Sequence, residues 1–232
     1  MSLTTEKPKK GGDFKIVPDG IHVVRCVRVI DLGVQSFTYN GETKSAPKVQ
    51  ISYEFPNERI TIEGEDLPMM LSREFTKSLH EKATLRSFLK NWRGKDFTEE
   101  ELEGFDIRKL LSAPAMLTVV HESGTGANSA KTYANISAIS KLPAEFPKGT
   151  KIVCPPQETP SLFYEIEMGK NEVFSSLPDW IQKKIMASKE FVNGEVITDG
   201  PGKIEVPPPS QDNDDPNDTG YSGRDDDQTL PF

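Results

Sequence analysis

Alternating apolar and polar residues predict strands in the first part of the chain. Residues 21–30 are rich in Val and Ile and follow the turn-forming Pro18-Asp19-Gly20, so they predict a long strand, with a bend or bulge at Asp31-Leu32-Gly33. Asn40-Gly41 is a strong hairpin signal. In the next strand, residues 48–55, we expect one face in the core and one in water: Val49, Ile51, Tyr53 and Phe55 on the first, Lys48, Gln50, Ser52 and Glu54 on the second.

A third, shorter strand is predicted at residues 59–63, and the period then changes from two to about 3.6. Apolar residues fall at i, i+3, i+4 and i+7 of a helix that Gly94 ends: Leu85, Phe88, Leu89 and Trp92. Ser78 with Glu81 fits a capping box at its start. A second capping box, Thr98 with Glu101, predicts a short acidic helix, and Asp106 is expected to cap another.

Strands return at residues 115–122 and 131–141, on either side of a Ser/Gly/Thr/Asn-rich loop. The order is three strands, a helical insertion and two strands. This is the order of an OB-fold, a five-stranded barrel with a helix between strands three and four. We therefore expect a mainly β protein with helical insertions, although other small α+β domains share this order.

The predicted domain boundaries follow changes in composition. Residues 1–12 are a flexible N-terminus, 13–143 the OB-fold domain, 144–192 a Pro-rich linker with a small α/β appendage, and 193–232 a disordered acidic tail. Within the appendage we expect a short strand at 162–166. A helix should begin at Pro178-Asp179-Trp180 and turn Ile181 and Ile185 inward. The pattern leaves open whether this segment packs on the barrel or binds a partner.

Charge is concentrated in the tail. Residues 205–232 hold eight acids and one base, a net charge of −7, whereas the whole chain carries −8. The body is therefore nearly neutral, which does not exclude an anionic ligand. The sequence shows neither a membrane span nor a signal peptide, and Cys26 and Cys154 fit reduced thiols, so we expect a cytoplasmic protein.

Catalysis finds little support in these residues. The three histidines lie far apart without metal-site spacing, and Gly124-Thr125-Gly126 lacks the residues of a phosphate loop. We expect no enzyme activity, no metal and no cofactor. A metal-dependent nuclease remains a weaker alternative, and it would use scattered carboxylates: Glu54, Glu63, Glu65 and Asp66.

Single-stranded nucleic acid is bound by basic side chains that contact phosphates and aromatic rings that stack on bases. The candidates for these roles are Arg28, Gln35, Phe37, Tyr39, Lys48, Arg73, Phe75, Lys77, Arg93, Lys95, Lys131 and Tyr133. Each has a structural alternative: Phe37 and Phe75 are also candidate core residues, and single Lys or Arg residues are usually only solvated.

The end of the chain resembles the acidic tip of bacterial single-stranded DNA-binding proteins, in which carboxylates precede a terminal Pro-Phe. The matching residues are Asp225, Asp226, Asp227, Leu230, Pro231 and Phe232, with Gln228-Thr229-Leu230 as a departure from the usual spacing. In that family the tip docks onto replication, recombination and repair proteins. The resemblance implies the same kind of partner for this chain.

The body is similar instead to a group of bacteriophage- and prophage-encoded proteins regarded as OB-fold single-stranded DNA binders. The similarity lies in residues 71–82, 92–98, 177–181 and 185–190. It implies a protein that binds single-stranded DNA without strong sequence preference during phage replication or recombination, in an infected or lysogenic host. A protein-interaction or assembly adaptor is the alternative, and the oligomeric state is left open.

Overall fold

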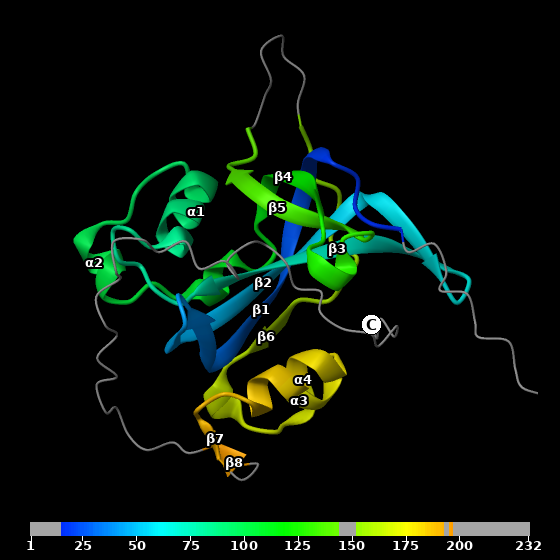
Figure 1. Cartoon of the computed structure of the whole chain (residues 1–232). Helices are drawn as coiled ribbons and strands as arrows, with labels where there is room; N and C mark the ends of the chain where they lie inside the picture. Colours follow the sequence, from blue (N-terminus) through cyan, green and yellow to red (C-terminus); the bar gives the residue numbers. More distant parts are fainter. Residues whose placement is uncertain (1–14, 144–151, 193–194, 197–232) are drawn as a thin grey trace, which may run out of the picture.

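A strongly curled antiparallel sheet forms the body of the protein in the computed structural model, which describes residues 15–143, 152–192 and 195–196 (Figure 1). Its five long strands run in the order β3-β2-β1-β4-β5. Their bounds are β1 (Gly20–Tyr39), β2 (Glu42–Ile62), β3 (Glu65–Thr76), β4 (Pro114–Ser123) and β5 (Thr132–Ser140). The prediction of a mainly β chain is confirmed.

Two tight turns connect the first three strands. Asn40 and Gly41 have φ of 50° and 80°, as a two-residue hairpin with positive φ at both central positions requires. Glu63 and Gly64 form the second turn with φ of 52° and 91°. Residues 59–62 are therefore not a third strand, because they continue β2 beyond a bulge after Phe55. Glu63 belongs to the turn, and the third strand is β3.

The predicted bend at Asp31-Leu32-Gly33 is confirmed. The register between β1 and β2 shifts between Asp31 and Gly33, and Gly33 has φ of 69°. The Gly33 N–H donates to the Asp31 carboxylate at 3.0 Å. This bulge re-aims the second half of β1.

The inner side of the curled sheet is the main core. Tyr53, Phe55 and Phe75 are fully buried there. The helix α1 (Thr84–Arg93), between β3 and β4 in the sequence, covers it with the predicted face: Leu85, Phe88, Leu89 and Trp92. The Trp92 ring lies 5.5 Å from that of Tyr53, so the core interpretation of Trp92 is confirmed.

The ends of the short helices agree with the caps predicted from the sequence, with one exception. Gly94 ends α1 with φ of 70°, but its N-cap is Ala83 and not Ser78, because the Ser78 hydroxyl accepts from the nearby His80 N–H instead. Thr98 forms its capping box with Glu101 at α2 (Glu99–Glu103). Asp106 caps the 3-10 helix η1 (Ile107–Leu110) as predicted. A further 3-10 turn, η2 (Gly126–Asn128), lies between β4 and β5.

The polar face of β2 is not in water. Gln50 and Glu54 are fully buried and Ser52 is 2% exposed, which corrects the sequence prediction. The segment from residue 152 to β6 (Leu162–Tyr164) covers this face, and β6 pairs in parallel with β1. The Glu54 carboxylate accepts the N–H groups of Glu158 at 3.1 Å and Thr159 at 2.5 Å, so the covering backbone satisfies the buried acid.

A second apolar cluster forms on the same outer face. Its elements are η3 (Ile166–Met168), α3 (Glu172–Ser176), α4 (Asp179–Met186) and the ladder of β7 (Phe191–Val192) with β8 (Glu195–Val196). Ile30 and Leu32 of β1 pack against Ile181 and Ile185 of α4. Residues 152–192 therefore pack on the sheet, and α3, α4, β7 and β8 lie below it in Figure 1.

Polar contacts also hold this C-terminal unit. The Lys184 ammonium contacts the Glu74 carboxylate at 2.6 Å, and the Val34 N–H donates to the Glu190 carboxylate at 2.9 Å. Tyr164 donates to the Gly169 carbonyl at 3.2 Å, and burial raises the pKa of its hydroxyl to about 12.

The predicted flexible segment 1–12 and the tail beyond residue 196 lie outside the described residues. Glu195 and Val196, beyond the predicted boundary at 193, form the short strand β8.

Candidate nucleic-acid interface

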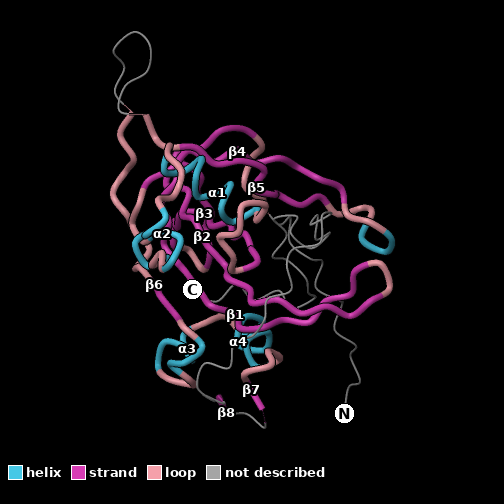
Figure 2. The backbone as a smooth tube through the Cα atoms, turned by 90° about the vertical axis from the view of Figure 1, so that its left-hand side faces the viewer, coloured by secondary structure: helices cyan, strands magenta, loops and turns pink. Residues whose placement is uncertain are grey.

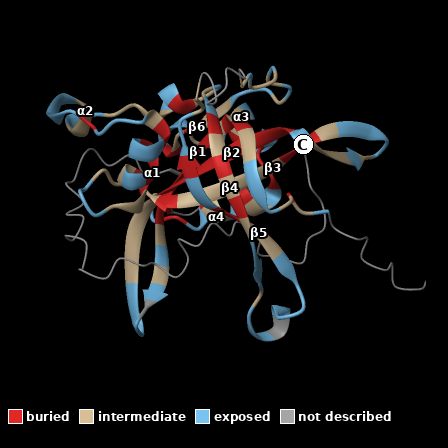
Figure 3. Cartoon of the chain, turned by 90° about the horizontal axis from the view of Figure 1, so that it is seen from above, coloured by how far each residue is buried: buried red, intermediate tan, exposed pale blue. Residues whose placement is uncertain are grey.

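Two long hairpins project from the same side of the sheet. They are the distal parts of β1 and β2 and of β4 and β5, and we call them the β1–β2 arm (residues 35–47) and the β4–β5 arm (residues 121–134). Figures 2 and 3 show both arms extending beyond the body in one direction, at the right of Figure 2 and the bottom of Figure 3.

The β1–β2 arm carries a ring and a cation in contact. The Lys48 ammonium lies 5.0 Å from the centre of the half-buried Phe37 ring, and it donates to the Thr76 hydroxyl at 3.2 Å. Phe37 pairs with Lys44 across the hairpin, so these two side chains share a face. Tyr39 ends β1, and its side chain lies outside the described part. Lys48 itself is buried, with 7% of its surface exposed, which corrects the prediction that it contacts DNA. The arm thus presents the Phe37 ring beside Lys44.

The β4–β5 arm carries the other candidates. Lys131 is exposed and Tyr133 is half-buried. Tyr133 pairs with Glu122 across the hairpin, and its ring edge lies where a Cβ on Gly124 would be only 2.8 Å away. The absence of a side chain at Gly124 therefore lets the Tyr133 ring lie against the turn. This arm thus carries an aromatic ring and an exposed lysine two residues apart in the sequence.

Two candidates on β3 belong to the core instead. Phe75 is fully buried, so it cannot stack on a base, which corrects that prediction. The Arg73 guanidinium lies 5.1 Å from the Phe75 ring and 5.4 Å from the Phe88 ring, and it donates to the Ile136 carbonyl of β5 at 2.9 Å. Arg73 therefore links β3 to β5 and is not free to contact phosphates.

Gln35 and Arg28 lie under the C-terminal unit. The Gln35 amide donates to the carbonyls of Leu32 at 2.6 Å and Lys184 at 3.0 Å, so it anchors α4. Arg28 pairs with Leu162 of β6, and burial lowers the pKa of its guanidinium. Both residues are half-buried and contact the C-terminal unit rather than either arm.

Arg93 and Lys95 lie by the helical insertion. Arg93 forms an ion pair with Glu101 and lies 4.4 Å from the Phe97 ring, so it holds α2 against α1. Lys95 is exposed. Of the two, only Lys95 is placed as the sequence prediction requires.

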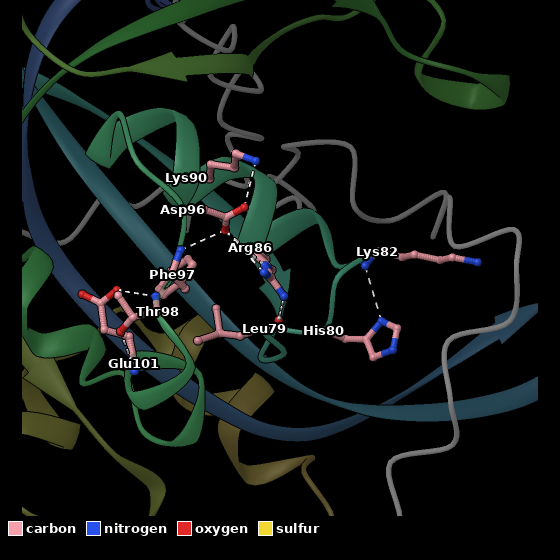
Figure 4. A network of polar contacts seen from close by, with 9 residues as sticks. All are labelled: Leu79, His80, Lys82, Arg86, Lys90, Asp96, Phe97, Thr98 and Glu101. Carbon is pink, nitrogen blue, oxygen red and sulfur yellow. Dashed lines mark hydrogen bonds and ion pairs between the residues drawn. The ribbon is translucent and has the colours of Figure 1, made fainter.

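Two other basic residues of α1, Arg86 and Lys90, belong to a polar network around Asp96 (Figure 4). The Asp96 carboxylate accepts from Lys90 at 2.8 Å, from the Phe97 N–H at 2.9 Å and from Arg86 at 3.4 Å. The Lys90 hydrogen bond, followed by that of the Phe97 N–H, lowers the pKa of Asp96 to about 2. Arg86 and Lys90 are thus engaged with this one acid.

Lys77 lies at the rim of a cavity of about 310 Å³ at the root of the β1–β2 arm. Its ammonium contacts the Asp31 carboxylate at 2.5 Å. Residues that the sequence did not single out for binding line the rest of this cavity, among them Phe105, Arg108 and Glu165. No sequence signal marks them, because β6 comes next to β1 only through a parallel pairing across more than a hundred residues.

The carboxylates of the nuclease alternative are not gathered in one place. Glu54 is buried beneath the covering segment, whereas Glu63, Glu65 and Asp66 lie at the β2–β3 turn. Asp66 is paired there with Arg59 at 3.0 Å. Among residues 15–143, 152–192 and 195–196, no cluster of three potential metal ligands occurs.

Two further features bear on the sequence expectations. Cys26 and Cys154 form no disulfide with each other, and burial raises the pKa of the Cys26 thiol. In the described part of the chain, no helix has the length and apolar character needed to cross a membrane.

Comparisons with known proteins give no relative: no family model matches the chain, and neither a curated protein nor a solved structure matches it.

Proposed function

We propose that this chain is an OB-fold protein that binds single-stranded DNA without strong sequence preference. The strand order supports the fold assignment. β1 pairs with both β2 and β4, and Arg73 reaches from β3 to the Ile136 carbonyl of β5. In an OB barrel the strands are neighbours in the closed order 1-2-3-5-4-1. Here the Arg73 side chain would link β3 to β5, where that order closes. OB-folds bind oligonucleotides on the face of strands two and three and with the loops between strands one and two and between strands four and five.

The observation that carries the proposal is the projection of both arms from one side of the sheet (Figure 3). They are the two loops that an OB-fold uses for oligonucleotides. Phe37 and Tyr133 would stack on bases, at about 1–3 kcal/mol for each base. Lys44 and Lys131 would lie near the phosphates, and this contribution weakens as salt rises.

The biological setting of the proposal comes from the resemblances in the sequence. A phage or prophage protein of this kind would coat single strands exposed during replication or recombination in the bacterial cytoplasm, without catalysing a reaction. The acidic tip at residues 225–232 would recruit partner proteins. Because the tip and its tether are covalently attached, they would also compete with DNA at millimolar effective concentration.

Fluorescence anisotropy of the full chain tests the DNA-binding class. Labelled oligo-dT should bind more tightly than a duplex of equal length, and its affinity should fall steadily between two salt concentrations because bound phosphates release counterions. No oligo-dT binding at low salt contradicts the proposal and favours the protein-interaction adaptor. Magnesium-dependent shortening of the oligonucleotide would favour the nuclease.

Two truncations separate the roles of the tail. Removing Leu230, Pro231 and Phe232 should leave oligo-dT affinity almost unchanged, since it removes no acid, while abolishing recruitment of a partner. Removing residues 205–232 deletes a net charge of −7 and should tighten DNA binding at low salt. The two variants and the full chain are compared by the same anisotropy titration. Equal affinity in all three would contradict competition by the tail.

A further inference from the structure

The cavity beside Lys77 is built from parts of the chain that lie far apart in sequence. The Lys77 N–H donates to the Pro47 carbonyl at 2.7 Å, which places the cavity at the root of the β1–β2 arm. Its opposite walls are the loop between α2 and η1 and the strand β6. Its volume of about 310 Å³ falls at the lower end of the range for small-molecule sites.

The floor of the cavity is apolar and its walls are aromatic. Val29 and Val49 are almost fully buried at its base. Phe105 and Phe163 are half-buried in its walls. The Arg108 guanidinium lies 5.3 Å from the centre of the Phe163 ring. A flat, uncharged aromatic group would find apolar contact below and a planar cation beside it, and guanidinium planes are stacking partners for bases.

The charges around the cavity exclude a phosphate as its occupant. Three carboxylates, Asp31, Asp106 and Glu165, face two cations, Lys77 and Arg108. Both cations are already paired, with Asp31 at 2.5 Å and with Asp106 at 2.9 Å. Glu165 forms no ion pair with any residue that the structure describes. The unmatched charge is therefore negative, and it favours an occupant that donates hydrogen bonds.

We propose that this cavity takes one unstacked base of the bound strand and prefers a base whose edge donates hydrogen bonds, guanine first. The proposal rests on the proposed single-stranded DNA binding. Guanine carries two adjacent donors, N1–H and the N2 amino group, which match the two oxygens of a carboxylate such as Glu165. Thymine carries a single donor between two carbonyl oxygens, and these would face the excess negative charge. A basic polypeptide would also meet the excess negative charge, but its cation would lie over the apolar floor of Val29 and Val49, so it is the alternative outcome of the test.

The test compares labelled oligo-dT with the same oligonucleotide carrying one central dG, titrated against the full chain. The dG oligonucleotide should bind about tenfold more tightly, which corresponds to about 1.4 kcal/mol and lies within the range of a bidentate base contact. Glu165→Gln should remove this preference, because it replaces one carboxylate oxygen by an amide NH2, which donates and would face a donor of the guanine edge. The matched control is Glu167→Gln, an exposed acid two residues along the chain, which should keep the preference.

A second variant blocks the cavity without removing a charge. A Cβ on Gly104, which lines the cavity, would meet no atom within 4 Å, and its φ of −170° is open to any residue. Gly104→Leu should therefore fold normally, lose the preference for dG and keep the affinity for oligo-dT.

The outcomes separate this proposal from the proposed function. Equal binding of both oligonucleotides overturns the base site while leaving DNA binding intact, and no binding of either overturns both. A dG preference that survives in Glu165→Gln and Gly104→Leu places the preference elsewhere and overturns the assignment. Binding of an oligo-arginine peptide that Glu165→Gln abolishes, without any dG preference, would assign the cavity to a basic polypeptide and also overturn it.

Discussion

The strands β1 and β2 are covered along one half and free along the other. In the covered half, Gln50 and Glu54 are fully buried beneath the C-terminal unit. In the free half, the β1–β2 arm extends beyond the body with its turn at Asn40-Gly41 exposed (Figure 3). Both halves combine apolar and polar residues. The difference shows that alternation identifies the two faces of a strand but not what covers them.

The C-terminal unit covers polar side chains because it brings its own hydrogen-bonding groups. Backbone N–H groups of Glu158 and Thr159 reach Glu54, and Lys184 reaches Glu74. These contacts offset the cost of burying charge. The two arms extend beyond this cover, with Lys131 exposed and Phe37 and Tyr133 half-buried.

The largest loss of stability should come from a substitution at Gly33, where the C-terminal unit packs closely on β1. A Cβ there would lie 2.5 Å from Ile166 and 2.7 Å from Ser188, and the positive φ adds backbone strain. Gly33→Ala should lower the free energy of unfolding by about 2–5 kcal/mol, from strain of about 1–2 kcal/mol and overpacking of about 1–3 kcal/mol. Urea denaturation measures it.

The free arm supplies the control for this change. Gly41 has φ of 80°, but a Cβ there would meet nothing within 4 Å. Gly41→Ala should therefore cost only the backbone strain of about 1–2 kcal/mol. Equal losses in the two variants would mean that the C-terminal unit does not press on Gly33 in solution.

A smaller effect is expected at Glu54. Glu54→Gln leaves one of the N–H groups of Glu158 and Thr159 without a good acceptor, so the free energy of unfolding should fall by about 1–3 kcal/mol. The matched variant, Glu42→Gln, changes an exposed acid at the start of β2, where a change within about 0.5 kcal/mol is expected. Denaturation that does not distinguish the two variants would contradict the buried position of Glu54.

Local signals predicted much of the fold. The Asn40-Gly41 turn, the apolar face of α1 and the Thr98 capping box all depend on residues a few positions apart. The third strand was missed because its turn uses Glu63-Gly64 instead of Asn-Gly. Pro68, inside β3, also argues against a strand in the sequence.

The site was harder to predict because contacts between residues far apart in the sequence decide which candidates are exposed. Arg73 and Arg93 carry the same charge as Lys131, yet the first two are held by aromatic rings and by groups on other elements. Gln35 is recognisable as an anchor only once α4 is placed on β1. The sequence identifies polar and aromatic candidates, and packing against β5, the helical insertion and the C-terminal unit decides which of them are engaged in the fold.

The central claim is that the free arms, and not the covered sheet, bind single-stranded DNA. Anisotropy titration of oligo-dT with Phe37→Ala and Tyr133→Ala tests it most directly, with Thr38→Ala and Thr132→Ala as controls at exposed neighbouring positions on the same arms. Each aromatic variant should weaken binding by about 1–3 kcal/mol while unfolding as the wild type does to within about 1 kcal/mol, and the threonine variants should bind normally. Unchanged affinity in both aromatic variants would contradict the account.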